Sequence, residues 1–250
     1  MAGEDNDQAT ARAPAQPMRA MVLSAGLGTR LQPLTRKMPK PLVRVAGRTL
    51  IDRILDRLED AGIEEVVVNT HHKAEMLQDH LAERASPRIT ISHEPELLET
   101  GGGVLQALPL LGDGAFLAIN SDIIWHDAVE DSLRLLQRRF DPERMDALLL
   151  LQPTVTAVGY EGRGDFTMSP GGQLARRRPA RIAPFLFAGI QILQPHLFDG
   201  MVVEPFSLNR VYDRAAENGR LYGLRHDGEW LEVGTPARLR FAEQLLRGRR

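Results

Sequence analysis

Short apolar runs alternate with segments of helical periodicity through the first part of the chain. The run Ala20–Leu23 is apolar throughout and is followed by Gly26 and Gly28, which is typical of a buried parallel strand that ends in a glycine-rich loop. The apolar positions of 50–58 recur at helical spacing, and Gly62 follows where a C-terminal cap belongs. The same criteria predict further strands at 65–69, 89–92, 116–119 and 147–151, and helices near 76–81, 103–108 and 129–140.

This alternation predicts an α/β fold with a mostly parallel sheet. In such sheets ligands bind outside the carboxyl ends of the strands. The loops that follow Leu23, Asn69 and Asn120 would meet at that edge. We therefore expect the functional site to be built from these loops.

The second half of the chain is less regular. It contains the segment GYEGRGDF at 159–166, a Gly-Gly turn at 171–172, the basic run Arg176–Arg178 and the apolar stretch Ile182–Leu193. These features favour additional antiparallel strands and a lobe that covers the substrate. A last helix is predicted from Pro236 to Leu246.

Length and composition favour one soluble globular domain over 18–250, because 250 residues with 43% hydrophobic residues can bury a large core. Residues 1–17 are polar with repeated Ala-Pro breaks, so we expect a disordered leader there. No run approaches the roughly 20 apolar residues of a membrane helix, and the N-terminus lacks the pattern of a signal peptide. These observations predict a cytoplasmic protein without a membrane partner.

Charge and cysteine content exclude several classes of function. The 31 basic and 33 acidic residues are interspersed and leave a net charge of -2, which disfavours a nucleic-acid partner. The chain has no cysteine, so disulfides, thiolate nucleophiles, cysteine-ligated zinc and iron–sulfur clusters are excluded. No feature of the sequence determines the oligomeric state.

The segment Leu23–Thr35, followed by Pro39–Leu42, has the composition of a phosphate-binding loop. Glycines after a buried strand let backbone N–H groups approach an anion closely, and Arg30 and Lys40 supply positive charge. Lys40 is one of 3 lysines in a chain that has 31 basic residues in all. Neither a Walker A loop nor a complete dinucleotide fingerprint is present, because no GK[ST] follows and Leu31 stands where the third glycine would be.

Asp122 follows a predicted buried strand in the motif Asn-Ser-Asp. Its carboxylate would point from the strand end into the cleft, where hard oxygen ligands suit Mg²⁺. The alternative is an Asx turn or a helix N-cap, which are common roles for aspartate. The residues alone leave these two roles open.

The strings LSAGLGTRLQPLT and PKPL closely resemble the N-terminal signature of the sugar-1-phosphate nucleotidyltransferases. The resemblance extends from Arg19 to about Leu246 and includes further motifs at 99–103, 120–122, 162–166, 187–190 and 230–236. It implies a Rossmann-like three-layer sandwich with a mostly parallel mixed sheet and no C-terminal β-helix. The implied reaction joins a nucleoside triphosphate to a sugar 1-phosphate with Mg²⁺ as cofactor and releases pyrophosphate.

Within the family, the motifs ETGGG and GRGDF and the short length resemble enzymes that use UTP and N-acetylmuramate 1-phosphate in cell-wall recycling. Enzymes that use GTP and mannose 1-phosphate are the alternative. A catalytically silent sensor of nucleotides or nucleotide sugars is a third hypothesis, from another functional class.

The resemblance also implies roles for charged residues. Arg30 would bind the β- and γ-phosphates and the leaving pyrophosphate, and Lys40 would bind the α-phosphate and the sugar phosphate. Asp122 would hold Mg²⁺ together with Glu232, although the family commonly has aspartate at the second position. Glutamate places its carboxylate one methylene further from the backbone, so it would act as a shifted ligand, through a water, or in a weakened site.

The nucleotide would lie along the glycine-rich loop and along ETGGG, which is expected to precede a helix and to offer its amides. Glu94 or Glu96 falls near the position that reads the base, and a carboxylate would accept hydrogen bonds from guanine or uracil equally well. The residues assigned to the nucleotide are therefore Ala25, Gly26, Gly28, Thr29, Glu94, Glu96, Thr100, Gly101 and Gly102.

The sugar is expected to contact small and aromatic residues of the second half, because glycine permits close approach and an aromatic ring can stack on a sugar face. Phe187 is equally well explained as a core residue. The roles of His71, His72 and the run Arg176–Arg178 stay open. The residues assigned to the sugar are Gly164, Phe187, Gly189 and Trp230.

Overall fold

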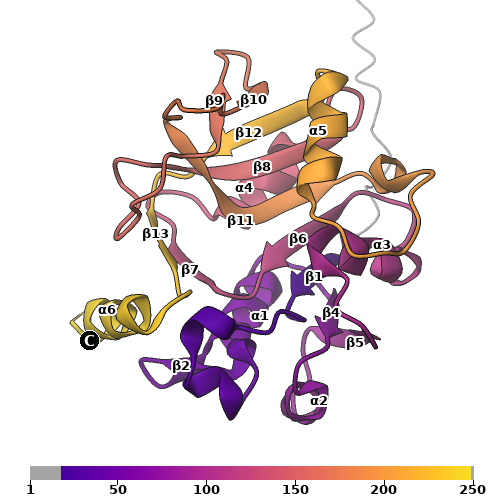
Figure 1. Cartoon of the computed structure of the whole chain (residues 1–250). Coiled ribbons are helices and arrows are strands. Elements are labelled where there is room, and N and C mark those ends of the chain that lie inside the picture. Colours follow the sequence, from indigo (N-terminus) through magenta and orange to yellow (C-terminus); the bar gives the residue numbers. More distant parts are fainter. Residues whose placement is uncertain (1–17, 249–250) are drawn as a thin grey trace, which may run out of the picture.

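The computed structural model describes residues 18–248 and is built on a nine-stranded mixed sheet with helices on both faces (Figure 1). The expected leader at 1–17 lies outside the described residues. The strands of the sheet are β1 (Ala20–Leu23), β4 (Glu65–Thr70), β5 (Arg88–His93), β6 (Phe116–Asn120), β8 (Ala147–Pro153), β9 (Phe166–Met168), β10 (Leu174–Arg176), β11 (Phe185–Leu193) and β12 (Leu221–Arg225).

Two small antiparallel sheets, six α-helices and four short 3-10 helices complete the described chain. The small sheets pair β2 (Arg44–Val45) with β3 (Arg48–Thr49) and β7 (Ile123–His126) with β13 (Glu229–Glu232). The helices are α1 (Leu50–Asp60), α2 (Ala74–Ala82), α3 (Glu99–Leu111), α4 (Ser132–Arg139), α5 (Asn209–Glu217) and α6 (Pro236–Arg247). None of these helices is long and apolar enough to cross a membrane.

The sheet is parallel at its centre, as predicted. Strand β1 pairs in parallel with both β4 and β6, and β4 pairs in parallel with β5. Strand β11 then runs antiparallel to both β6 and β8, so the sheet is mixed. The carboxyl ends of β1, β4 and β6 therefore lie at one edge, where the sequence predicts the site.

Alternating residues of β1 show that the sheet is buried on both faces. Ala20 and Val22 belong to the core that packs against α1, α2 and α4. Met21, between them, belongs to the core that packs against α3 and α5. Side chains of a strand point alternately to its two faces, so these two cores are the interfaces of a three-layer α/β sandwich, which confirms the expected fold class.

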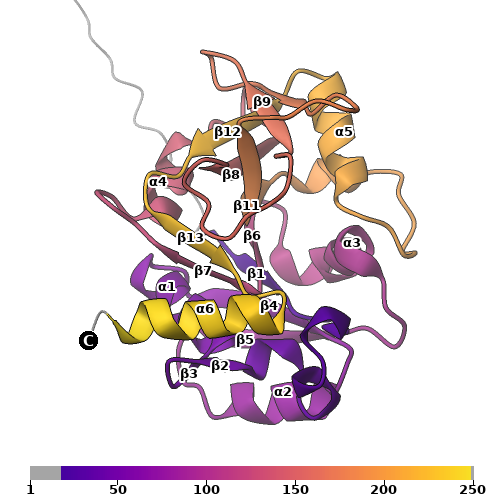
Figure 2. The same ribbon diagram turned by 60° about the vertical axis from the view of Figure 1, so that its left-hand side comes forward.

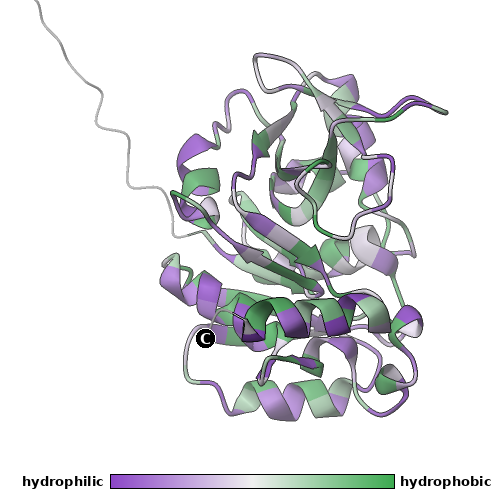
Figure 3. Ribbon diagram, turned by 90° about the vertical axis from the view of Figure 1, so that its left-hand side faces the viewer, coloured by the Kyte–Doolittle hydropathy of each residue, from purple (hydrophilic) through white to green (hydrophobic). Residues whose placement is uncertain are grey.

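The second half contains the expected antiparallel strands β9, β10 and β11, and also α5, which the sequence analysis did not predict. Helix α6 confirms the last predicted helix and lies beside β13 and β2 (Figure 2). It carries hydrophilic and hydrophobic residues in turn (Figure 3) and buries Ala242 and Leu246 in a third apolar cluster with Leu31 and Val233. This cluster connects the end of the chain to the glycine-rich loop.

Candidate active site

A cavity of about 470 Å³ opens at the carboxyl ends of the central strands. The loops after Leu23, Asn69 and Asn120 meet there, as predicted from the alternation of strands and helices. The lining includes Ser24, Ala25, Gly26, Gly28, Thr29, Arg30, Lys40, Asn69, Thr100, Asn120, Ser121, Asp122, Ser207 and Gly234.

The glycine-rich loop is held in one conformation by contacts with the chain that follows it. Gly28 has a φ of 62°, in the left-handed region that favours glycine. A Cβ at Gly28 would stand 2.8 Å from Cγ2 of Thr35, and the hydroxyl of Thr35 donates a hydrogen bond of 2.8 Å to the carbonyl of Gly28. The short helical turn Thr29–Leu31 starts directly after Gly28 and places Arg30 at the mouth of the cavity.

Lys40 and Asp122 form an ion pair inside the cavity. The ammonium group of Lys40 donates to Oδ2 of Asp122 at 2.6 Å. Both side chains are largely buried, with exposed fractions of 12% and 22%, so solvent screens this pair less than a pair on the open surface. The pair joins the segment after the glycine-rich loop to the end of β6.

Glu232 is brought next to Asp122 by the pairing of β7 with β13. Glu232 stands opposite Ile123 in this ladder, and the amide of Val233 donates to the carbonyl of Asp122 at 2.7 Å. The carboxylate of Glu232 accepts a hydrogen bond of 2.9 Å from Nη2 of Arg30 and a second one from Arg238 of α6. Two carboxylates and three basic groups therefore meet at this end of the cavity: Arg30, Lys40 and Asp122 line it, and Glu232 and Arg238 lie outside the lining and are joined to it through Arg30.

The donor set at this rim fits Mg²⁺. Mg²⁺ is usually bound by one or two carboxylates together with substrate phosphates and waters, rather than by a cage of protein ligands. Asp122 and Glu232 supply two carboxylates, and the residues at 18–248 contain no cluster of three or more acidic, histidine or cysteine side chains that could hold a metal alone. A metal at this place would need the phosphates of a substrate to complete its shell.

The structure corrects the expectation for the segment ETGGG. This segment does not precede a helix but forms the first turns of α3, which begins at Glu99. The amides of Gly101 and Gly102 both donate to the carbonyl of Phe206, at 2.7 and 3.2 Å, so they are not free to bind a nucleotide. Of the nucleotide residues assigned in this segment, only Thr100 lines the cavity.

The glycines of α3 allow another segment to approach the helix closely. A Cβ at Gly102 would stand 2.1 Å from the carbonyl oxygen of Glu204, and a Cβ at Gly101 would stand 2.3 Å from the ring of Phe206. Because these Cβ atoms are absent, residues 204–207 pack directly on α3. Ser207 thereby reaches the cavity.

The structure places both candidates for reading the base, Glu94 and Glu96, outside the cavity lining. Glu94 is fully buried and accepts hydrogen bonds from Nδ2 of Asn69 at 2.7 Å and from the amide of Leu98 at 3.0 Å. Asn69 in turn accepts from the amide of Ser24 at 2.6 Å. Glu94 is thus part of the support of the cavity wall, whereas Glu96 is exposed and outside the lining.

The two histidines after β4 support neighbouring loops. A ring nitrogen of His71 lies 2.9 Å from the carbonyl of Glu94, and one of His72 lies 2.9 Å from the carbonyl of Thr35. Arg177, in the basic run Arg176–Arg178, donates from Nε to the carbonyl of Gly164 at 2.9 Å. All three residues lie outside the cavity lining.

None of the four residues expected to contact the sugar lines the cavity. Trp230 is 4% exposed and donates its indole N–H to the carbonyl of Ala188 at 2.8 Å, so its ring has a core position instead of a sugar-facing one. Phe187 packs edge-on against Tyr212 with ring centroids 5.8 Å apart. The other two residues are glycines that lie close to neighbouring chain. A Cβ at Gly164 would stand 2.2 Å from the carbonyl oxygen of Ala183, and a Cβ at Gly189 would stand 3.2 Å from Asn120.

Several residues of the site were missed by sequence reasoning. Ser24 and Ser121 line the cavity and lie within the motifs Leu-Ser-Ala-Gly and Asn-Ser-Asp, so their neighbours in the sequence could have indicated them. Ser207 and Arg238 lie in segments without a phosphate-binding pattern, and only their packing on α3 and on Glu232 places them at the site.

Known proteins share this chain's sequence and fold. Residues 19–160 match the protein family described as nucleotidyl transferase. The N-acetylmuramate alpha-1-phosphate uridylyltransferase of Caulobacter vibrioides is 41% identical over 235 residues, which cover 92% of this chain and 97% of the relative. The enzyme of the same name from Neisseria meningitidis serogroup B is 35% identical over 232 residues, with 91% and 98% covered.

The fold has a close counterpart among solved structures. A UDP-glucose pyrophosphorylase complexed with UDP-glucose superposes with a TM-score of 0.75 at 16% identity, and the superposition covers 94% of this chain and 100% of that one. This likeness agrees with the three-layer sandwich. The chain belongs to the nucleotidyl transferase family, among its sugar-1-phosphate nucleotidyltransferases.

Proposed function

We propose that the protein transfers the uridylyl group of UTP to N-acetylmuramate 1-phosphate and releases pyrophosphate. Two relatives that align over nearly their whole length carry this activity in their names. The observation that carries the proposal is the arrangement at the cavity, where Lys40 pairs with Asp122 and Arg30 pairs with Glu232 beside a glycine-rich loop. We further propose that the reaction serves cell-wall recycling in the cytoplasm.

The reaction needs no nucleophile from the protein. The second ionisation of a phosphate monoester lies near pH 6, so the sugar phosphate is already largely a dianion at pH 7. The difficulty lies in bringing two polyanions into line and in stabilising the charge that develops on pyrophosphate. Positioned cations and backbone amides are suited to this task.

Each group of the cavity rim has a place in this mechanism. The loop that contains Ala25, Gly26, Gly28 and Thr29 would bind the triphosphate. Arg30 would bind the β- and γ-phosphates and follow the leaving pyrophosphate, since its side chain is 65% exposed and can move. Lys40, which is largely buried, would hold the α-phosphate and the attacking sugar phosphate.

Asp122 and Glu232 would hold Mg²⁺, which when bound neutralises phosphate oxygens as a Lewis acid. In the structure each carboxylate is neutralised by a basic side chain of the same site. When a metal and a triphosphate enter, these ion pairs would separate. Arg30 and Lys40 would then bind phosphate oxygens, and Asp122 and Glu232 would bind the metal. The site therefore stays close to electrically balanced with and without substrate.

The proposal is tested by measuring pyrophosphate release across a grid of five nucleoside triphosphates and four sugar 1-phosphates in the presence of Mg²⁺. The four sugar 1-phosphates are N-acetylmuramate 1-phosphate, N-acetylglucosamine 1-phosphate, mannose 1-phosphate and glucose 1-phosphate. We expect the highest kcat/KM with UTP and N-acetylmuramate 1-phosphate. A preference for GTP and mannose 1-phosphate, or binding of a nucleotide without pyrophosphate release from any pair, would overturn the proposed substrates.

A further inference from the structure

Arg238 contacts the carboxylate of Glu232 from the side opposite to Arg30. Its Nη1 is bonded to Oε2 of Glu232, and its Nη2 donates to the carbonyl of Gly159 at 3.2 Å. Its own amide donates to the hydroxyl of Thr235 at 3.3 Å, which caps the N-terminus of α6. The guanidinium is therefore held by two acceptors, the carboxylate of Glu232 and the carbonyl of Gly159 in the loop after β8.

The two arginines that share Glu232 differ in their freedom to move. Arg30 is 65% exposed, and within residues 18–248 its one hydrogen bond to another side chain is the contact with Oε1 of Glu232. Arg238 is 28% exposed and is fixed by the carbonyl of Gly159 as well. When Arg30 turns to phosphate, Arg238 is the partner that stays.

Gly234 is a second feature of the chain that accommodates the contact between Glu232 and Arg30. A Cβ at Gly234 would stand 2.7 Å from Oε1 of Glu232 and 3.3 Å from Nη2 of Arg30. The φ of Gly234 is not among the positive values of the chain, so its backbone alone does not demand glycine. The absent side chain leaves room for the contact between Glu232 and Arg30.

We propose that Arg238 is a positioning residue for the metal site. It holds Oε2 of Glu232 so that Oε1, released when Arg30 moves to the triphosphate, faces the metal that Asp122 also binds. Without Arg238, a glutamate carboxylate on three rotatable bonds would turn to solvent or follow Arg30. This inference rests on the proposed function, because it assumes that a divalent cation enters with the nucleotide.

The test compares Arg238→Ala, Arg238→Lys and Arg240→Ala with the wild type. Arg240 is an exposed arginine on the same helix and serves as the matched control. Binding of Mn²⁺ in the presence of UTP and without a sugar phosphate is followed by electron paramagnetic resonance. Loss of a group that orients a metal ligand typically weakens metal binding about 10-fold or more, so we expect at least a 10-fold weaker Mn²⁺ affinity for Arg238→Ala.

The expected pattern has two further parts. Arg238→Lys should recover part of the Mn²⁺ affinity, and Arg240→Ala should match the wild type. In pyrophosphate release, Arg238→Ala should raise the Mg²⁺ midpoint about 10-fold and change kcat at saturating Mg²⁺ much less. A lower kcat with an unchanged Mn²⁺ affinity would overturn the proposal, as would an equal effect of Arg240→Ala.

Further measurements keep the result interpretable. Thermal unfolding shows whether Arg238→Ala is folded. If it is not, the Mn²⁺ affinities of Arg238→Lys and Gly234→Ala are compared with the wild type instead. Gly234→Ala should weaken Mn²⁺ binding too, because its methyl group crowds Glu232, and wild-type affinity in both variants would overturn the proposal. The Mn²⁺ experiment needs no sugar phosphate, so a wrong sugar shows only in the activity grid. If the grid favours another nucleoside triphosphate, that nucleotide replaces UTP in the Mn²⁺ experiment, and the comparison of the variants is unchanged.

Discussion

Lys40 illustrates how much chemistry one side chain contributes to this cavity. Its ammonium group lies 2.6 Å from Asp122 and is 12% exposed. Lys37, three residues earlier, is exposed and lies outside the cavity lining. The two lysines therefore have the same chemistry in different environments.

We expect Lys40→Ala to lower kcat about 10²–10⁴-fold, because removal of a positioned charge costs about 3–5 kcal/mol in the transition state. The midpoint of thermal unfolding should change little. Pyrophosphate release and a thermal melt measure the two effects, with Lys37→Ala as the control that should keep wild-type activity. Retention of most activity by Lys40→Ala would show that its proposed role is wrong.

For Trp230 we predict a loss of stability without a loss of substrate binding. Its indole N–H is bonded to the carbonyl of Ala188 in the core. In Trp230→Phe that buried carbonyl loses its partner, so we expect unfolding to become easier by about 1–3 kcal/mol. The KM for the sugar phosphate should stay within about twofold of the wild type, because the ring does not line the cavity. Denaturant unfolding and steady-state kinetics check this; a large rise in KM without loss of stability would restore the sugar-stacking role.

At the scale of elements, α3 shows how backbone packing overrides helix propensity. Three consecutive glycines lie in its first turns, although glycine costs about 1 kcal/mol relative to alanine inside a helix. The packing of residues 204–207 on α3 requires these glycines, because residues 204–207 occupy the space that side chains would fill. The result is that Ser207 reaches the cavity from a distant part of the chain.

We expect Gly102→Ala to destabilise the protein by about 1–3 kcal/mol, as overpacking of a filled interior does. Its Cβ would stand 2.1 Å from the carbonyl oxygen of Glu204. Gly114→Ala is the matched control, since a Cβ there meets open space. Urea unfolding compares the two variants. A neutral or stabilising Gly102→Ala would mean that residues 204–207 can withdraw from α3 at little cost.

The elements that could be predicted from the sequence are those with a strong local pattern. The apolar run of β1 and the helical periodicity of α1 are visible without any partner. By contrast, β7 and β13 are four residues long each, and their ladder joins positions about a hundred residues apart. Such a pairing depends on the surrounding fold, which is why the contact of Glu232 with its arginines could not be derived from local pattern.

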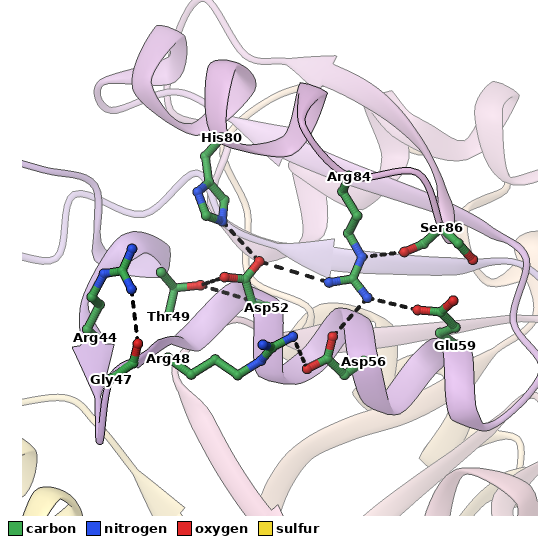
Figure 4. A network of polar contacts seen from close by, with 10 residues as sticks. All are labelled: Arg44, Gly47, Arg48, Thr49, Asp52, Asp56, Glu59, His80, Arg84 and Ser86. Atoms are coloured by element: carbon green, nitrogen blue, oxygen red, sulfur yellow. Dashed lines mark hydrogen bonds and ion pairs between the residues drawn. The ribbon is translucent and has the colours of Figure 1, made fainter.

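At the scale of the whole molecule, charged groups join helices that lie on one face of the sheet. Asp52 of α1 accepts from the hydroxyl of its N-cap Thr49 and lies 2.9 Å from a ring nitrogen of His80 of α2 (Figure 4). Arg84, after α2, bridges Asp56 and Glu59 of α1. This network links α1 to α2 on the outer face of the sandwich.

Burial raises the pKa of Asp52, but hydrogen bonds from Thr49 and His80 and the charges of His80 and Arg48 outweigh it, so the net pKa lies below its ordinary value of 3.8. A carboxyl group with a lowered pKa in the folded state stabilises the protein above its ordinary pKa. Its contribution is lost as the pH falls below 3.8. Stability should therefore decline with acidification in this range.

The measurement is the free energy of unfolding between about pH 6 and about pH 3 for the wild type and for Asp52→Asn. We expect the variant to be less stable near neutrality and to show a shallower decline with acid, because it lacks the titrating group. Asp79→Asn, which changes an exposed carboxylate on α2, should keep the wild-type slope. Equal slopes for wild type and Asp52→Asn would contradict the prediction.

The sequence by itself determined the alternation of strands and helices and the edge of the sheet where the cavity lies, and it predicts a phosphate-binding role for the glycine-rich loop with Arg30 and Lys40, which line that cavity. These follow from local periodicity and from residue types at short spacing, which act within one or two elements. Glu94 and Trp230 are buried instead of lining the cavity, because burial, not residue type, decides whether a side chain faces a cavity.

Only the tertiary structure decided which distant groups meet at the site. The pairing of Asp122 with Lys40, the sharing of Glu232 by Arg30 and Arg238, and the approach of Ser207 along α3 each join segments far apart in the chain. Such contacts arise from the packing of whole layers against one another. No local pattern contains them, because the free energy that holds them comes from burial shared among all the elements.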